Sequence, residues 1–316
     1  MRAAALFLGL LASAVAAAQD YPSKPVRLVV GFPPGGNVDV VGRIVAQKMS
    51  EGLTQQVVPE NRTGAGSIIA NEYVAKSAAD GYTLLIVSGA FVTQAATMKK
   101  LPYDSLRDFS FISTIVTYPL VFSVRSDSRF RTLGEFIAFV KSSPGKVNYP
   151  SPGMGTLYHL AGEMFVSMAG IEMQHVPFRG GSEPLTEVLS GRMELLIDAL
   201  TNSYPHIQGG KFRPLAVTSL ARSASLPDVP TVAQSVPGYE ASSFLGIAGP
   251  PRVPGAIVER INREVRRVLA LPEIAQRFAE WGGTPSASSP EEMRRHVAAE
   301  IEKWEKVVEA RKLELQ

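Results

Sequence analysis

The 316-residue sequence predicts an α/β protein with two lobes, each a mostly parallel sheet flanked by helices. Short β-branched runs alternate with amphipathic helical segments, a pattern typical of parallel sheets that helices cover on both faces. Two extended stretches, 111–124 and 242–248, interrupt the alternation, and we interpret them as strands that cross between lobes. The first should be a strand pair broken by Pro119. The expected lobes are 19–116 with 246–316, and 117–245, with a hinge and a cleft between them.

The first lobe should begin with a strand at 26–30, then a Gly/Pro-rich loop and a helix from about Val38. The apolar stripe of this helix is Val41, Ile44, Val45 and Met49. Short strands are expected at 56–58 and, after an Asp-Gly turn, at 83–87. These runs account for the sheet of the first lobe.

Local start signals predict three further helices. Thr132 and Glu135 have the spacing of a capping box, and so have Ser289 and Glu292, with a proline at the first helical position. Apolar residues between 157 and 168 recur with the helical period. We interpret all of these apolar stripes as core.

Composition excludes several classes of protein. The 45% hydrophobic content suits a globular chain rather than a disordered one. The 32 basic residues are nearly balanced by 29 acidic ones, so no basic stripe points to nucleic acid. Cysteine is absent, which excludes thiol catalysis, zinc–thiolate sites and disulfides. The four histidines lack metal-ligand spacing, so we expect neither a metal nor a cofactor, and a monomer is the simplest expectation.

Residues 1–18 are interpreted as a secretory signal peptide. Met1-Arg2 is a basic start, 3–17 is apolar apart from Ser13, and three alanines at 16–18 fit the cleavage rule. The alternative is a membrane anchor, but the apolar run is shorter than the ~20 residues that span a bilayer. We therefore expect an exported, soluble mature protein.

The first candidate site is the loop between the 26–30 strand and the next helix. It contains Pro34, Gly35, Gly36, Asn37 and Asp39. Glycines let the backbone approach a ligand, and the free N–H groups of a helix start favour an anion. The alternative is a tight turn that Asn37 or Asp39 caps.

A second loop before the 157–168 helix has the same character. It contains Ser151, Gly153, Gly155 and Thr156. Two such loops, one in each lobe, would hold a carboxylate without a buried Arg. His159 lies in the first helical turn, where the helix dipole favours a neutral imidazole. It is either a ligand residue or a packing histidine that bonds the loop.

Three further polar residues are candidates. Arg179 precedes a helix and would pair with a ligand carboxylate, or is a solvated surface residue. Asp198 and Ser88 end apolar strands, at the sheet edge where α/β proteins bind ligands. Asp198 is alternatively a cap for the next turn.

Enzyme signatures are absent from the sequence. It has neither a Gly-x-Ser-x-Gly elbow nor a phosphate-binding Gly-Lys loop, and 64–70 only half matches a dinucleotide loop. We therefore expect no enzyme. The alternative is a secreted hydrolase or lyase that uses His159 and Asp198 on a small acid.

Taken in order, the motifs resemble the Bug (TctC-type) family, the periplasmic substrate-binding proteins of tripartite tricarboxylate transporters. They are FPPGG at 32–36, NRTGAG at 61–66, DGYTLL at 80–85, LPYD at 101–104, HLAGEMF at 159–165, VPFRG at 176–180, LAVTS at 215–219 and LPDVPTV at 226–232. The resemblance covers essentially the whole mature chain. It implies a Venus-flytrap fold that closes on one small ligand.

The resemblance also implies roles for residues and partners. Loops like 34–39 and 151–156 grip a carboxylate through backbone groups, hydroxyls and water, and residues like Asp198 help to choose the ligand. The partner would be the inner-membrane permease of such a transporter, or alternatively a sensor. Val38, Met154 and Phe244 depart from the family pattern, which bears on the identity of the ligand.

Overall fold

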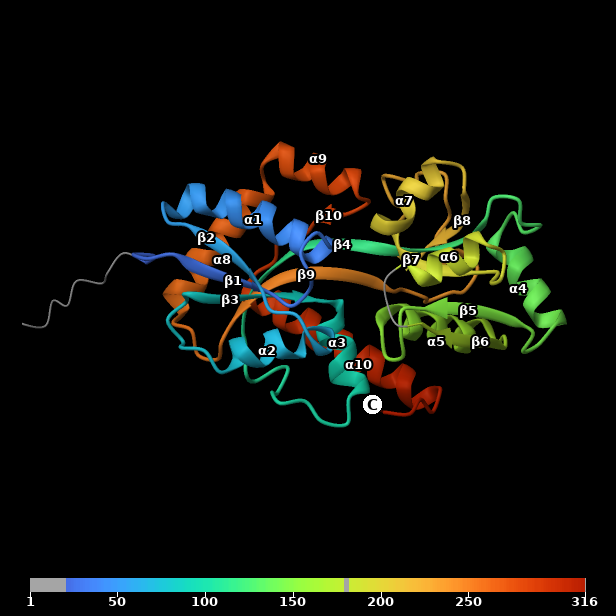
Figure 1. Cartoon of the computed structure of the whole chain (residues 1–316), viewed down its shortest axis with the longest axis horizontal. Coiled ribbons are helices and arrows are strands. Elements are labelled where there is room, and N and C mark those ends of the chain that lie inside the picture. The colour runs from blue at the N-terminus through green and yellow to red at the C-terminus, as the bar shows by residue number, and fades with distance from the viewer. Residues whose placement is uncertain (1–20, 179–181, 316) are drawn as a thin grey trace, which may run out of the picture.

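The computed structural model describes residues 21–178 and 182–315 (Figure 1). The strands are β1 (Val26–Val30), β2 (Val57–Asn61), β3 (Thr83–Ser88), β4 (Ser110–Arg125), β5 (Val147–Ser151), β6 (Met173–Pro177), β7 (Leu196–Ala199), β8 (Phe212–Val217), β9 (Ser242–Gly249) and β10 (Thr284–Pro285). The α-helices are α1 (Asn37–Leu53), α2 (Ile68–Ala75), α3 (Gly89–Thr97), α4 (Leu133–Ser142), α5 (Leu157–Ala169), α6 (Glu183–Leu189), α7 (Leu200–Gln208), α8 (Gly255–Leu269), α9 (Pro272–Glu280) and α10 (Pro290–Ala310). Short 3-10 turns lie at Ala65–Ser67 and Val232–Gln234. The predicted signal peptide at 1–18 lies outside the described residues.

Two groups of elements lie side by side along the long axis, and β4 and β9 run from one to the other (Figure 1). The main sheet has the order β10-β4-β9-β3-β1-β2, while β7 and β8 pair with the far half of β4. The α/β fold with two lobes is confirmed. The exact residues at which each lobe ends remain a prediction.

Strand direction follows from the two crossings. β1 is parallel to β2 and β3, and β5 is parallel to β6, as expected. The crossing strands pair antiparallel with each other, and β9 also pairs antiparallel with β3. The main sheet is therefore mixed, because β9 runs antiparallel to both of its neighbours, β3 and β4.

The predicted break at Pro119 is wrong, because β4 is one strand of 16 residues. Pro119 is the last residue of β4 in register with β9, and Leu120 is the first in register with β7. A proline has no N–H to donate to a sheet, so it fits where a strand changes partners. Pro119 therefore does not end the strand but marks the position where β4 crosses from the first lobe to the second.

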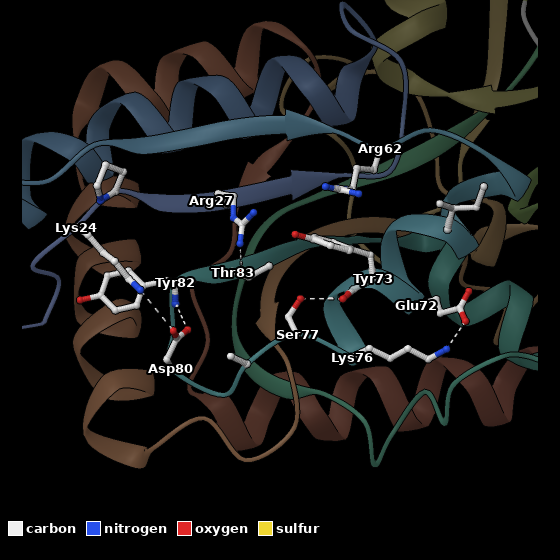
Figure 2. Close-up of a pocket in the computed structure, with 13 residues that line it drawn as sticks. Lys24, Arg27, Arg62, Glu72, Tyr73, Lys76, Ser77, Asp80, Tyr82 and Thr83 are labelled. Carbon is white, nitrogen blue, oxygen red and sulfur yellow. Dashed lines mark hydrogen bonds and ion pairs between the residues drawn. The ribbon is translucent and has the colours of Figure 1, made fainter.

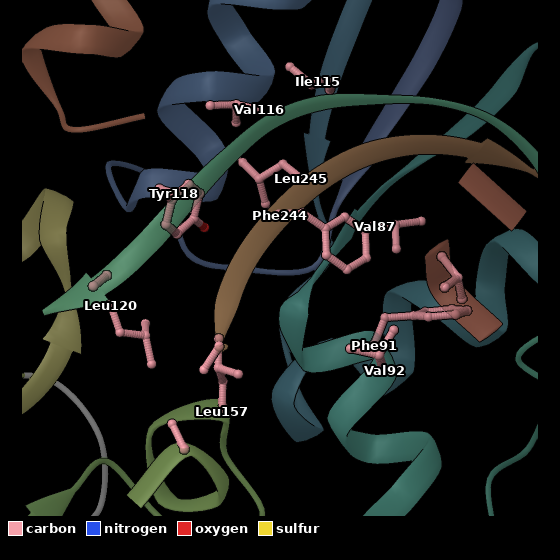
Figure 3. Close-up of a cluster of buried hydrophobic side chains, with 14 of the residues drawn as sticks. Val87, Phe91, Val92, Ile115, Val116, Tyr118, Leu120, Leu157, Phe244 and Leu245 are labelled. Carbon is pink, nitrogen blue, oxygen red and sulfur yellow. The ribbon is translucent and has the colours of Figure 1, made fainter. Parts of the chain in front are cut away.

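The core is continuous across the crossing. Side chains from β3, α3, β4, α5 and β9 pack together there (Figure 3). Phe244 and Leu245 of β9 belong to the same cluster as Leu157 of the second lobe, and all three are buried. The two lobes thus share one hydrophobic core.

Both predicted capping boxes are confirmed. The Thr132 hydroxyl accepts the Glu135 N–H at 3.1 Å, and Ser289 does the same for Glu292 at 3.2 Å. In each box the Glu carboxylate also accepts the N–H of the cap residue. Within 21–178 and 182–315, none of the helices is both long and apolar enough to cross a bilayer.

Candidate functional site

The loop between β1 and α1 is held by the buried carboxylate of Asp39. Gly35 has a φ of 83°, and its N–H donates to Oδ2 of Asp39 at 2.9 Å. Arg43 donates to the same oxygen at 2.9 Å, and Asn61 donates to Oδ1 at 2.7 Å. Burial raises the pKa of Asp39, but these hydrogen bonds outweigh it and lower the pKa to about 2. Asp39 therefore shapes the loop, while Pro34, Gly35 and Gly36 stay exposed.

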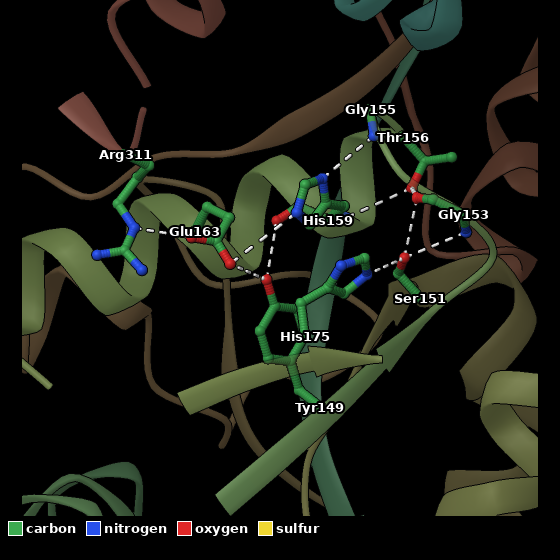
Figure 4. Close-up of polar contacts among 9 residues, drawn as sticks. All are labelled: Tyr149, Ser151, Gly153, Gly155, Thr156, His159, Glu163, His175 and Arg311. Atoms are coloured by element: carbon green, nitrogen blue, oxygen red, sulfur yellow. Dashed lines mark hydrogen bonds and ion pairs between the residues drawn. The ribbon is translucent and has the colours of Figure 1, made fainter. Parts of the chain in front are cut away.

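The loop before α5 is held by the same kind of hydrogen bond, from a glycine N–H to a side chain, but the acceptor is different. Gly155 has a φ of 69°, and its N–H donates to Nδ1 of His159 at 3.1 Å (Figure 4). Thr156 caps α5 and also donates its hydroxyl to the Gly153 carbonyl at 2.7 Å. In both lobes, then, a glycine N–H is bonded to the side chain four residues later.

His159 lies behind this loop as a neutral ring. It is buried, and burial lowers its pKa although the nearby Glu163 charge acts to raise it. Its ring stacks on His175 with 3.9 Å between centroids, and His175 Nε2 lies 2.6 Å from the Ser151 hydroxyl. That hydroxyl also accepts the Gly153 N–H at 3.1 Å. The neutral state agrees with the expectation, and Ser151 and His159 support the loop from within.

Residues from both lobes meet at a point that we call the interlobe junction. Its members are Asn37, Tyr118, Tyr158, Asp198 and Ser243. Tyr118 of β4 lies opposite Ser243 of β9 in the sheet, and its hydroxyl is hydrogen-bonded with the side chains of Ser243 and Asn37. Burial raises the pKa of Tyr118, so this phenol keeps its proton.

Tyr158 and Asp198 form the side of the junction contributed by the second lobe. Burial, followed by the charge of Asp198 and the nearby Tyr118, raises the pKa of Tyr158 well above its usual value. Asp198 accepts the Ala199 N–H at 2.8 Å and also bonds Asn202 at 3.3 Å and Ser203 at 3.2 Å. Burial nevertheless raises the pKa of Asp198 to about 6. A carboxyl group at this position changes charge close to neutral pH.

Ser88 brings a third helix start to the junction. It precedes α3, its side chain makes no capping bond, and it is in register with Leu245 of β9. A Cβ added at Gly89 would lie 3.1 Å from the Ser243 hydroxyl oxygen and 3.4 Å from Leu157. The starts of α1, α3 and α5 therefore converge, and each helix start carries a partial positive charge.

The loops, Ser88 and Asp198 are predicted from the sequence as candidate site residues, whereas Tyr118, Tyr158 and Ser243 are not. No local signal singled them out, because β4 also contains Ser113, Thr114 and Thr117, and β9 begins with Ser242 beside Ser243. Arg179 lies outside the described residues. Within the described residues, there is no group of three His, Asp or Glu that would hold a metal.

A separate surface pocket of about 880 Å³ lies at the other ends of the strands (Figure 2). It surrounds Arg27 and Thr83 at the amino ends of β1 and β3, whereas the junction lies at their carboxyl ends. Three of its four cations pair with carboxylates: Lys24 with Asp80 at 3.7 Å, Arg62 with Glu60 at 2.6 Å and Lys76 with Glu72 at 2.5 Å. Because α/β sheets bind ligands at the carboxyl ends of their strands, the junction is the stronger candidate.

Comparison with known proteins gives one family. Residues 41–313 match the family described as "Tripartite tricarboxylate transporter family receptor". BugT of Bordetella pertussis is 33% identical over 299 residues, which cover 94% of this chain and 92% of that protein. A solved R. palustris protein with adipate has a TM-score of 0.82 at 35% identity and covers 92% of this chain and 98% of that one. MatC from Rhodopseudomonas palustris with bound malate has a TM-score of 0.78 at 28% identity, with 91% and 100% covered. The chain therefore belongs to the Bug (TctC-type) family of tripartite tricarboxylate transporter receptors.

Proposed function

We propose that this chain is a periplasmic solute-binding protein that captures a small carboxylate between its lobes. It delivers the ligand to the inner-membrane permease of a tripartite tricarboxylate transporter and performs no chemistry. Two relatives of known structure hold adipate and malate, and another is described as a periplasmic binding protein. The predicted signal peptide at 1–18 agrees with export.

The observation that carries the proposal is the convergence of three helix starts at the interlobe junction. The starts of α1 and α3 have no side-chain cap, so their N–H groups and partial positive charge are available to an anion. Asn37, Tyr118 and Ser243 add side-chain donors beside them. A carboxylate held there would touch both lobes and favour a closed arrangement.

The predicted binding residues divide into two groups under this proposal. Asp39, Ser151, Gly155 and His159 are engaged in bonds that set loop shape. The groups that we expect to face the ligand are then the remaining loop backbone at 34–37 and 153–156, with Ser88, and Arg179 stays a prediction from the sequence. Asp198 lies opposite and selects the ligand through its charge.

Ligand capture is tested on protein purified from the periplasm. Denaturing mass spectrometry identifies any acid that co-purifies, and thermal shift with adipate, malate and other acids measures binding. At ligand 100-fold above Kd, stabilisation should reach about 2.7 kcal/mol. Gly155→Asp should abolish the shift, because it places a negative charge at the start of α5.

Gly145→Asp is the matched control. Gly145 has a φ of 70°, close to the 69° of Gly155, and no atom lies within 4 Å of an added Cβ. The φ angle therefore strains the backbone similarly in the two variants, and Gly145→Asp should bind like wild type. Failure of the wild-type protein to bind any acid would contradict the proposed function, and equal binding by both variants would contradict the helix-start site.

A further inference from the structure

The C-terminal helix forms a third link between the lobes. α10 begins at its Ser289 cap in the first lobe and packs against α3, β4 and α5. Figure 1 shows it extending below both lobes toward α5, where the chain ends. Arg311, the residue that caps this helix, donates from Nε to Oε2 of Glu163 at 2.7 Å (Figure 4). The end of α10 is thus tied to the second lobe by a charge-assisted bond.

Glu163 is a buried carboxylate with a partner on each oxygen. Its exposed fraction is only 5%, and Tyr149 donates to Oε1 at 2.7 Å while Arg311 holds Oε2. Removing one partner from a buried charge is costly, because the charge loses its compensation without regaining water. The position and charge of Glu163 therefore depend on Arg311.

Glu163 faces the histidine that holds the binding loop. Its Oε1 lies 3.9 Å from Nε2 of His159, one helical turn earlier. A negative charge at that side favours the tautomer with a proton on Nε2. Nδ1 is then free to accept the Gly155 N–H, as the 3.1 Å contact requires.

We propose that Arg311 and Glu163 are positioning residues for ligand binding, which act through the tautomer of His159 on the backbone of Gly155. The proposal rests on the proposed function at the junction. The first lobe has no such dependence, because there the acceptor of the glycine N–H is the permanently charged Asp39. The shape of the second loop is set instead by a chain of contacts that begins on the C-terminal helix.

Arg311→Met tests the proposal, with Lys306→Met as the matched control. Lys306 is a cation on the same helix, but its partner Glu302 is exposed and belongs to that helix. Nitrogen-15 spectra of the His159 ring should show mixed tautomers in Arg311→Met, and the Gly155 amide should exchange faster. The Kd for adipate or malate, whichever wild type binds, should rise about tenfold, whereas Arg311→Lys should restore most of the affinity.

The pH profile separates positioning from a merely structural role. The titratable groups that face His159 are Glu163 on α5, His175 on β6 and Tyr149 on β5, with Arg311 acting through Glu163. Protonation of Nδ1 breaks the bond to Gly155, so affinity should fall as pH drops through the pKa of His159. Loss of Arg311 displaces or neutralises the Glu163 carboxylate, which removes the charge that raises the pKa of His159, so the fall should occur at lower pH in Arg311→Met.

The outcomes are distinct. Binding by wild type, with an unchanged His159 tautomer and wild-type affinity in Arg311→Met, would overturn the positioning proposal alone. An equal effect of Lys306→Met would overturn it as well, because any cation on this helix would then suffice. A wild-type protein that binds no acid would overturn the proposed function, and this proposal with it.

Discussion

Two aspartates in this chain have opposite electrostatic environments, although burial acts to raise the pKa of both. Asp39 accepts three hydrogen bonds, one of them from a guanidinium, and its pKa falls to about 2. Asp198 accepts only neutral donors, and burial raises its pKa to about 6. A charged partner therefore decides whether a carboxylate is a permanent anchor or a titrating group. The residue that faces the proposed ligand is the titrating one.

Asp198 should make the stability of the protein depend on pH. Its folded pKa of about 6 lies above its ordinary 3.8, so the folded state binds the proton more tightly than the unfolded state. Its contribution is favourable at low pH and is lost as pH rises from about 4 through 6. Urea unfolding from pH 4 to 8 measures this loss, which should be absent in Asp198→Asn. At pH 7 the free energy of unfolding of Asp198→Asn should exceed that of wild type by roughly 1–3 kcal/mol.

Asp228→Asn, at an exposed position in the same lobe, is the control and should change little. Ionised Asp198 would also repel an anionic ligand, so acid binding by wild type should strengthen as pH falls from 7 to 6, before protonation of His159 weakens it, and should strengthen less in Asp198→Asn. A wild-type stability curve that parallels that of Asp198→Asn over this range would contradict the raised pKa.

Secondary-structure elements that depend on local sequence signals are predicted correctly. β1 matches the predicted 26–30, and the helices α4 and α10 begin at the predicted capping boxes. These features depend on neighbours a few residues apart, so the sequence contains all that decides them. The two Gly-rich loops were found for the same reason, because a strand, a glycine turn and a helix start follow one another along the chain.

The rest of the site depends on pairing between distant segments. Tyr118 and Ser243 lie opposite each other only because β4 and β9 pair in one register, and 125 positions separate them in the sequence. Pro119 suggested a break, although it lies where β4 exchanges one partner for another. Periodicity along one strand does not record the register with another, so the junction could not be assembled from the sequence.

The two ends of α10 should have separable effects. Ser289→Ala removes the capping bond to Glu292 at the start of the helix and should cost about 1 kcal/mol of stability. It should leave ligand affinity unchanged, because the hydrogen bond to Glu163 comes from Arg311 at the other end of α10. Chemical unfolding and titration with the acid that wild type binds measure both. If Ser289→Ala lowers ligand affinity as much as Arg311→Met does, then destabilising α10 in general is sufficient to weaken binding, and the bond to Glu163 has no specific role.

At the scale of the whole molecule, the lobes are joined by more than two strands. β4 and β9 cross through a shared core, α10 reaches α5, and the Ser225 hydroxyl of the second lobe donates to the Ala279 carbonyl of α9 at 2.9 Å. A packed core resists continuous deformation, so closure should take place as a rotation of whole lobes about the crossing. The contacts of α10 and α9 then limit how far the lobes can open.

Ligand binding should therefore shorten the distance between lobes without altering either lobe. The chain contains no cysteine, so spin labels can be attached at chosen sites. Gln208→Cys on α7 with Gln276→Cys on α9 places one label on each lobe, and Gln47→Cys with Gln276→Cys keeps both on the first lobe; all three positions are exposed. Saturating acid should shorten and narrow the distance distribution of the first pair, leave the second pair unchanged, and have no effect in the Gly155→Asp background. If the acid binds and both distance distributions stay the same, the lobes do not close on the ligand. The ligand would then enter a preformed site, in which the helix starts of the two lobes have the same separation with and without the acid.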